Sequence, residues 1–213
     1  DVMRGLFDPE AAVVDEVVCE ITPIDALADR TAFDAMIRYR TGDAEGRFVG
    51  IETKYTEPFS PKAYDNDHYR SVTEASGWFV KGAADALVGA ATNQLWRGLM
   101  LAALTEEATG WRGSYVVVTP DDDVTAKNAV TAAKAQLTQP GRLDLVTVEE
   151  IIDAAAGSGQ CRTRDLGGSV RAALPAGERR QPVVIWASTT KHLLGACGNR
   201  ARSRRRSRKT KPL

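Results

Sequence analysis

The sequence predicts an α/β domain in which a central mixed β-sheet is flanked by helices. Residues 33–39 alternate apolar and polar side chains, which is typical of a half-buried strand. Residues 114–119 (SYVVVT) form a continuous apolar run, as expected of a strand that is buried on both faces. Residues 83–105 repeat an apolar side chain every four residues, which predicts one long helix facing the core.

The remaining elements are shorter. Residues 8–19 (DPEAAVVDEVVC) predict a short helix, or a helix running into a strand. Pro23 then turns the chain, because proline disfavours helix at the residue before it. An Ala-rich helix over 125–137 and a strand over 143–148 follow, and Thr147 is placed to cap a last helix.

The first strand continues into a predicted antiparallel hairpin. Residues 41–46 (TGDAEG) have the composition of a turn, and residues 47–55 form the returning strand. If Asp43 lies at the centre of the turn, Asp34 is directly opposite Glu52. Opposed side chains have Cβ atoms about 5 Å apart, whereas a slip of one residue would move the two acids to opposite faces.

An acid and a base share one face of the returning strand, because Glu52 and Lys54 are two residues apart. With Asp34 beside them, they predict a site for a metal ion and a water molecule. Phosphodiester hydrolysis needs an activated water and neutralisation of the charge on the phosphate, and Mg²⁺ held by oxygen ligands supplies both. Asp34, Glu52 and the carbonyl of Thr53 are the expected ligands, with Mn²⁺ as a possible substitute. Lys54 would orient the water or stabilise the phosphate oxygens.

These residues resemble the PD-(D/E)XK nuclease superfamily, through Asp34 and the later Ile51-Glu52-Thr53-Lys54. The wider text RTAFDAMIRYR…RFVGIETKYTEPFS, followed by NQLWRGLML and YVVVTP, resembles the restriction-endonuclease-like proteins of the PGN_0703 type. This likeness covers residues 15–155. It implies a restriction-endonuclease-like core in which Asp34 and Glu52 bind the metal and Lys54 assists catalysis.

The resemblance also implies two further site residues. Glu20, in preference to Glu16, would be the upstream acid that often completes the site, and Gln94 would lie next to it at the start of the long helix. Phe33 replaces the proline of the motif name. Each assignment has a plain alternative: an exposed cross-strand salt pair for Glu52 and Lys54, a surface carboxylate for each of the other acids, and a polar helix-edge residue for the glutamine.

Charge divides the chain of 213 residues into two parts. Residues 1–160 carry 14 basic and 26 acidic side chains, whereas residues 161–213 carry 14 and 2. We therefore expect a nuclease-like domain over 1–157 and a basic, largely disordered extension over 158–213. Residues 200–213 hold eight basic residues and no acid, which indicates either a solvated tail or non-specific polyanion binding.

Composition argues for a cytoplasmic protein without a membrane span. The longest uncharged stretch is 11 residues, over 86–96, far short of a bilayer crossing. The three cysteines are odd in number and widely spaced, which fits reduced thiols better than disulfides. No CxxC pair exists, and His68 and His192 are far apart, which argues against zinc.

The sequence thus predicts a Mg²⁺-dependent endonuclease that hydrolyses DNA. Two alternatives stay open: a catalytically silent protein of the same fold that binds nucleic acid or a protein partner, and a hydrolase of RNA or nucleotide phosphoesters. The acidic domain predicts weak intrinsic DNA affinity. Binding would then depend on the basic tail, on a partner subunit such as a second copy in a homodimer, or on a local patch with the candidates Lys62, Arg70, Lys81 and Arg97.

Overall fold

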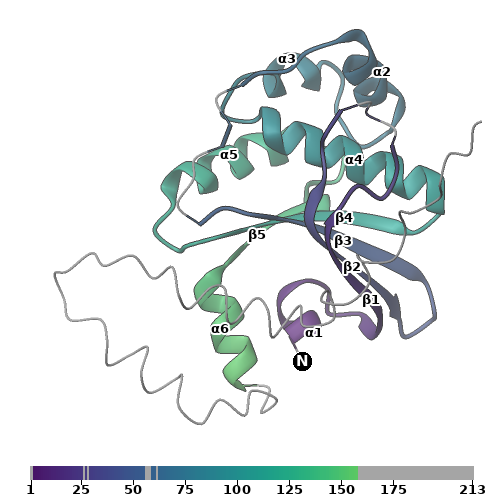
Figure 1. The fold of residues 1–213 in the computed structure, drawn as a ribbon, viewed down its shortest axis with the longest axis vertical. Coiled ribbons are helices and arrows are strands. Elements are labelled where there is room, and N and C mark those ends of the chain that lie inside the picture. Colours follow the sequence, from purple (N-terminus) through teal and green to yellow (C-terminus); the bar gives the residue numbers. More distant parts are fainter. Residues whose placement is uncertain (1, 26, 28, 56–58, 61, 158–213) are drawn as a thin grey trace, which may run out of the picture. The chain divides into compact units, whose positions relative to one another are not determined.

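The computed structural model describes residues 2–25, 27, 29–55, 59–60 and 62–157, and the predicted extension over 158–213 lies outside them. The described part contains a five-stranded sheet in sequence order, shown in Figure 1. Its first two strand pairs are antiparallel and its last two are parallel, so the sheet is mixed, as predicted. The strands are β1 (Ala11–Ile21), β2 (Phe33–Thr41), β3 (Gly46–Thr53), β4 (Arg112–Thr119) and β5 (Leu143–Thr147).

Helices cover both faces of this sheet (Figure 1). One face carries α4 (Asn93–Thr109) and α5 (Val124–Lys134), and α4 in turn packs against α2 (Asp67–Ala75) and α3 (Ala83–Leu87). The other face carries α1 (Val2–Leu6) and α6 (Val148–Gly157). A short 3₁₀ turn, η1 (Pro140–Arg142), precedes β5. Within the described residues, no helix combines the length and hydrophobicity that crossing a bilayer would require.

The main core lies between the sheet and α4. Phe48, Tyr115 and Val117 of the sheet belong to one buried cluster with Leu95 and Leu99 of the helix. Tyr115 packs directly on the helix backbone, because a Cβ atom added at Gly98 would lie 2.3 Å from its ring and its hydroxyl. This close approach brings the first turn of α4 over the end of β3, where Glu52 lies.

The hairpin and several other predicted elements are confirmed. Ala35 pairs with Ile51 and Arg40 with Gly46, which is the predicted register. The strand at 114–119 exists as β4, in which residues 115–119 are buried, and the strand at 143–148 exists as β5. Thr147 accepts a hydrogen bond from the Glu150 amide and returns one from its own amide to the Glu150 carboxylate, forming a capping box at the start of α6.

The helix predicted within residues 8–19 is absent, whereas the strand of the second alternative is present. Residues 11–21 form β1, an 11-residue edge strand that pairs along its length with β2, and α1 lies before them. The segment is rich in valine, whose branched side chain favours strands. Val13 and Val14 are exposed because β1 has a neighbour on one side alone.

The predicted helix over 83–105 is divided into α3 and α4. The chain leaves helical geometry around Gly89, and two side chains take up carbonyl groups at the end of α3. The Thr92 hydroxyl donates to Leu87 O at 3.0 Å, and the Asn93 amide donates to Val88 O at 3.2 Å. These local hydrogen bonds compete with continued helix. As a result α4 begins at Asn93 and Gln94 lies in its first turn.

Candidate active site

Three neighbouring strands bring an acidic residue to the same level of the sheet. The β2–β3 register, continued by one residue from Ala35 and Ile51, places Asp34 opposite Glu52. On the other side, Cys19 pairs with Ala35 and Ile21 with Phe33, so Glu20 is opposite Asp34. Antiparallel register alone therefore aligns Glu20, Asp34 and Glu52 across β1, β2 and β3.

Glu52 is a buried carboxylate with three donors around it. Glu52 is 6% exposed to solvent. Lys54 Nζ lies 2.8 Å and Gln94 Nε2 lies 2.6 Å from Oε1. The Tyr115 hydroxyl lies 3.4 Å from Oε2. Among the described residues, Oε2 thus has a single long contact, and it is the oxygen with capacity left for a ligand.

The surroundings of Glu52 raise its pKa above the ordinary value. Burial is the largest cause that raises its pKa, and the nearby charge of Asp34 raises it further. Lys54 acts in the opposite direction without restoring the ordinary value. Burial, with the charges of Glu52 and Asp34, also raises the pKa of Tyr115, so its phenol stays protonated and can donate. The site holds more negative charge than its own lysine neutralises.

Lys54 is held over the site by its backbone and by an aromatic ring. Its amide donates to Val118 O at 2.7 Å, which extends the β3–β4 pairing by one residue. Its ammonium lies 5.3 Å from the centre of the Phe59 ring and, as above, contacts Glu52. The residue is 9% exposed. A buried ammonium in contact with a carboxylate is the predicted acid–base pair, so an exposed salt pair is excluded for these two residues.

Asp34 is exposed and oriented by Thr53. Its Oδ2 accepts from the Thr53 amide and from the Thr53 hydroxyl, both at 2.7 Å. It lies where β2 and β3 stop pairing, so it satisfies an amide that the ladder would otherwise leave open. Both hydrogen bonds end on Oδ2, and Oδ1 has no partner among the described residues. The predicted role of the Thr53 carbonyl as a ligand stays a prediction.

Gln94 connects Glu52 to the segment that follows the hairpin. While its Nε2 donates to Glu52, its Oε1 accepts from the Ser60 amide at 3.2 Å. The neighbouring Asn93, fully buried, exchanges two hydrogen bonds with the backbone of Tyr64. Gln94 therefore lies next to Glu52, as predicted. The side-chain amides of Asn93 and Gln94, both in the first turn of α4, also hold the backbone of Tyr64 and Ser60 in place.

Glu20 is less well fixed than the other acids. It is exposed and has a positive φ of 50°, the left-handed region that few residues other than glycine adopt. In the described part of the chain, no group of three carboxylate, histidine or cysteine side chains is arranged to hold a metal. Glu20 shares the level of Asp34 and Glu52 without completing a three-ligand cluster, and its role stays a prediction.

Comparison with protein families identifies the superfamily of the chain. A family model of the PD-(D/E)XK nuclease superfamily matches residues 1–166. The chain belongs to the PD-(D/E)XK nuclease superfamily. Comparison with curated proteins and with solved structures finds no significant match. The assignment to the PGN_0703 type stays a prediction, whereas the α/β core of the superfamily is what the structure has.

The donor set of the candidate site fits a hard divalent cation. Asp34 and Glu52 offer carboxylate oxygens, and Mg²⁺ commonly takes one or two carboxylates and completes its shell with water and substrate phosphate. Two carboxylates are therefore enough protein ligands for Mg²⁺. The raised pKa of Glu52 points the same way, because a cation would relieve the repulsion between the two acids.

The site residue that sequence reasoning missed is Tyr115. It reaches Glu52 because β4 lies parallel to β3, with Gly50 beside Tyr115 and Glu52 beside Val117. A tyrosine in an otherwise aliphatic strand was the available signal, since a buried phenol needs a hydrogen-bond partner. The identity of that partner depends on the register of two strands that are about 60 residues apart in sequence.

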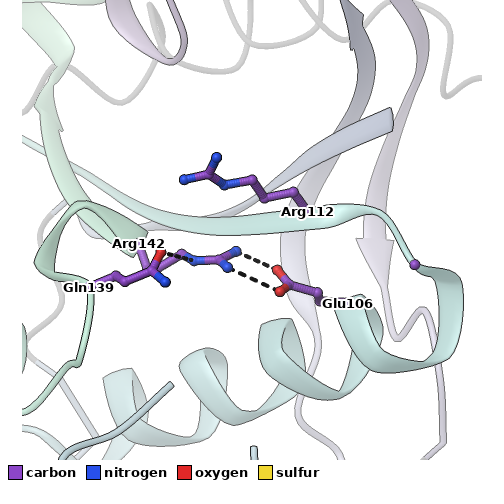
Figure 2. Close-up of a pocket in the computed structure, with 5 residues that line it drawn as sticks. Glu106, Arg112, Gln139 and Arg142 are labelled. Atoms are coloured by element: carbon purple, nitrogen blue, oxygen red, sulfur yellow. Dashed lines mark hydrogen bonds and ion pairs between the residues drawn. The ribbon is translucent and has the colours of Figure 1, made fainter. Parts of the chain in front are cut away.

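One further polar region lies apart from this site. An open depression of about 540 Å³ lies at the far end of α4, lined by Glu106, Gly110, Arg112, Gln139 and Arg142 (Figure 2). Glu106 is 12 residues beyond Gln94, about 18 Å along the helix. Arg142 is already engaged there with Glu106, with Gly113 O at 2.6 Å and with the Trp78 ring, so the depression contains a structural ion pair.

Proposed function

We propose that this PD-(D/E)XK protein is a Mg²⁺-dependent endonuclease that hydrolyses DNA phosphodiester bonds. Asp34 and Glu52 would hold the metal, and Lys54 would act on the reacting groups. The observation that carries the proposal is the buried Glu52, in contact with Lys54 and Gln94 and opposite Asp34 on the next strand. A salt pair formed for stability alone has no need of the second, repelling carboxylate.

Each residue of the candidate site has a defined part in this proposal. A bound divalent cation would neutralise charge on the phosphate and activate a water. Gln94 and Lys54 both contact Oε1 of Glu52, which fixes the carboxylate and leaves Oε2 without a contact to either of them. Thr53 orients Asp34 in the same way, through Oδ2. These fixed hydrogen bonds pre-organise both carboxylates, which reduces the reorganisation that binding would otherwise require.

Lys54 would stabilise the pentavalent phosphate as negative charge develops on its oxygens. Its ammonium is kept close to the reacting position by Glu52 and by the Phe59 ring. In a partly dehydrated site such a charge acts more strongly than in water. Since Lys54 also balances Glu52, its removal affects both the metal-binding carboxylate and the phosphate.

Supercoiled plasmid incubated with Mg²⁺ tests the proposal. Wild-type protein is compared with Glu52→Gln, which keeps the shape of the side chain, and with Lys54→Ala. Glu107→Gln is the matched control, because Glu107 is an exposed acid at the other end of α4. We expect nicking by wild type and by the control and a loss of about 100-fold or more in the other two.

Other outcomes separate the alternatives. Equal nicking by all four proteins would indicate a contaminant and overturn the site assignment. Binding without cleavage that the substitutions leave unchanged, and that is lost on removing residues 200–213, would support the catalytically silent nucleic-acid-binding protein. Labelled single-stranded RNA and labelled DNA of equal length, tested side by side, decide between the DNA and RNA substrates.

A further inference from the structure

Arg97 lies beside the candidate active site on the same helix that positions Glu52. It follows Gln94 by three residues in α4, so the two side chains are neighbours on one side of the helix. Gln94 contacts Glu52, and the charge of Arg97 acts on the phenol of Tyr115, which also contacts Glu52. Arg97 is therefore within electrostatic range of the acids.

The guanidinium of Arg97 is held in a fixed plane. Nη1 donates to the Thr31 hydroxyl at 3.2 Å, and the guanidinium carbon lies 4.8 Å from the centre of the Tyr64 ring. The side chain is 16% exposed. Its Nε is buried and has no hydrogen-bond partner in the part of the chain that the structure describes. Buried donors without a partner are rare in folded proteins, so the described residues leave one donor of this guanidinium unsatisfied.

The positive charge of Arg97 is incompletely neutralised. Its carboxylate partner, Asp29, lies 3.7 Å away, the longest ion pair among the described residues. Asp29 also accepts hydrogen bonds from the Tyr69 hydroxyl and from Thr31. By contrast, Arg70, a further candidate of the predicted DNA-binding patch, makes ion pairs at 2.7 and 2.8 Å with two different acids, so its charge is already balanced.

We propose that Arg97 binds a phosphate of the nucleic-acid backbone next to the scissile position, an inference that rests on the proposed nuclease function. A guanidinium in a fixed plane matches two phosphate oxygens at once, which an ammonium does not. Residues 1–160 carry 26 acidic against 14 basic side chains, so the domain as a whole repels a polyanion. Lys54 is occupied by Glu52. Arg97 makes the longest ion pair among the described residues, so more of its charge is available to a phosphate.

Binding of a short fluorescently labelled DNA duplex tests this assignment. The measurements are made in the Glu52→Gln background, where the proposed function predicts no turnover, over a range of salt concentrations. Arg97→Met and Arg97→Lys are compared with Arg70→Met, which removes the same charge from a guanidinium already paired with two acids. Thermal melting of each variant is recorded beside the affinity.

We expect Arg97→Met to weaken binding about tenfold and to make the negative slope of log affinity against log salt shallower by about one. Arg97→Lys should weaken binding while keeping the slope, because it retains the charge and loses the planar fork. Arg70→Met should change the affinity less than about twofold. A purely structural Arg97 would lower the melting temperature and leave the slope of the remaining folded protein unchanged, which overturns the inference.

The failure of this inference is distinguishable from failure of the proposed function. If wild type nicks plasmid and both Arg97 variants bind like the Arg70 variant, the phosphate assignment is wrong and the nuclease stands. If wild type neither binds nor nicks DNA or RNA, both are overturned. If wild type binds without cleaving, the salt slope of Arg97→Met still decides whether Arg97 contacts phosphate.

Discussion

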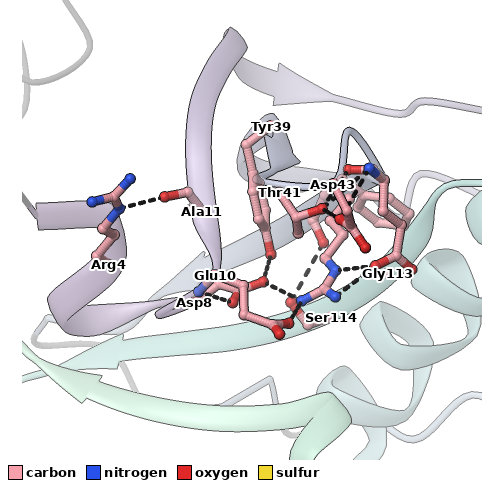
Figure 3. Close-up of polar contacts among 12 residues, drawn as sticks. Arg4, Asp8, Glu10, Ala11, Tyr39, Thr41, Asp43, Gly113 and Ser114 are labelled. Carbon is pink, nitrogen blue, oxygen red and sulfur yellow. Dashed lines mark hydrogen bonds and ion pairs between the residues drawn. The ribbon is translucent and has the colours of Figure 1, made fainter.

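Two groups of charged side chains lie at opposite ends of the β2–β3 hairpin, and they differ in how well their charges balance. At one end, Arg47 contacts three carboxylates: Asp8 at 2.9 Å, Glu10 at 2.6 Å and Glu45 at 2.5 Å. Asp8 also accepts from the Tyr39 hydroxyl at 2.7 Å (Figure 3). At the other end, Glu52 has Lys54, Gln94 and a long contact to Tyr115.

The pKa directions separate the two groups. Burial raises the pKa of Asp8, but hydrogen bonds from Tyr39, the Glu10 amide and Arg47 outweigh it, and the net pKa is lowered. Burial raises the pKa of Glu52, Asp34 adds to it, and the net pKa stays raised. We infer that the ion pairs of Arg47 hold the N-terminal segment against the sheet. The acids Glu52 and Asp34, by contrast, need a cation to balance their charges. Perturbed carboxylates of the second kind are typical of functional sites.

Replacing Arg47 or Lys54 by methionine gives the largest contrast between the two charged groups. Arg47→Met should destabilise the fold by about 3 kcal/mol, because Asp8 then stays buried and charged without its partner, and the folded fraction should keep its activity. Lys54→Met should cost less stability, because Glu52 can take up a proton, but should lower cleavage by about 100-fold or more. Urea unfolding and plasmid nicking measure the two effects. Comparable losses of stability in both variants would remove the distinction.

The two tyrosines give a smaller version of the same test. Tyr39→Phe removes a short hydrogen bond to a carboxylate, and we expect a loss of about 1.5–3 kcal/mol of stability with unchanged activity. Tyr115→Phe removes a contact of 3.4 Å, so the expected loss of stability is below about 1 kcal/mol. Its effect should instead appear as a few-fold higher Mg²⁺ requirement for cleavage. An unchanged Mg²⁺ requirement would mean that Tyr115 does not position Glu52.

Much of the site follows from local patterns in the sequence. Alternation over 33–39 and the turn centred on Asp43 fix the register that pairs Asp34 with Glu52, since a slip would bury the wrong face. Gln94 was located through the family resemblance, and its hydrogen bond to Glu52 depends on where α4 begins. That start was not predictable from apolar spacing, which continues through Gly89. Tyr115 and Arg97 depend on contacts between distant segments, which no local pattern encodes.

The smallest expected effects are in the pH dependence of stability, and their signs are opposite. The pKa of Asp8 is lowered on folding, so its contribution is present above about pH 4 and is lost as the pH falls through the folded value. The pKa of Glu52 is raised, so its contribution is present below about pH 4 and is lost as the pH rises through the folded value.

Urea unfolding across this pH range measures both contributions. Relative to wild type, Asp8→Asn should become less stable and Glu52→Gln more stable as the pH rises from about 3 to 7. Two differences of the same sign would show that the carboxylates do not differ as described. Adding Mg²⁺ should reduce the Glu52 effect, because a cation favours the charged carboxylate.

Divalent-metal binding tests the central claim most directly, because it is independent of any substrate. Titration calorimetry and thermal melting with Mn²⁺ and Mg²⁺ are made on wild type, Glu52→Gln, Asp34→Asn and the Glu107→Gln control. We predict that metal binds and raises the melting temperature of wild type and of the control, and that both effects disappear in Glu52→Gln and weaken in Asp34→Asn. The same binding and the same stabilisation in all four proteins would contradict a metal site at Asp34 and Glu52.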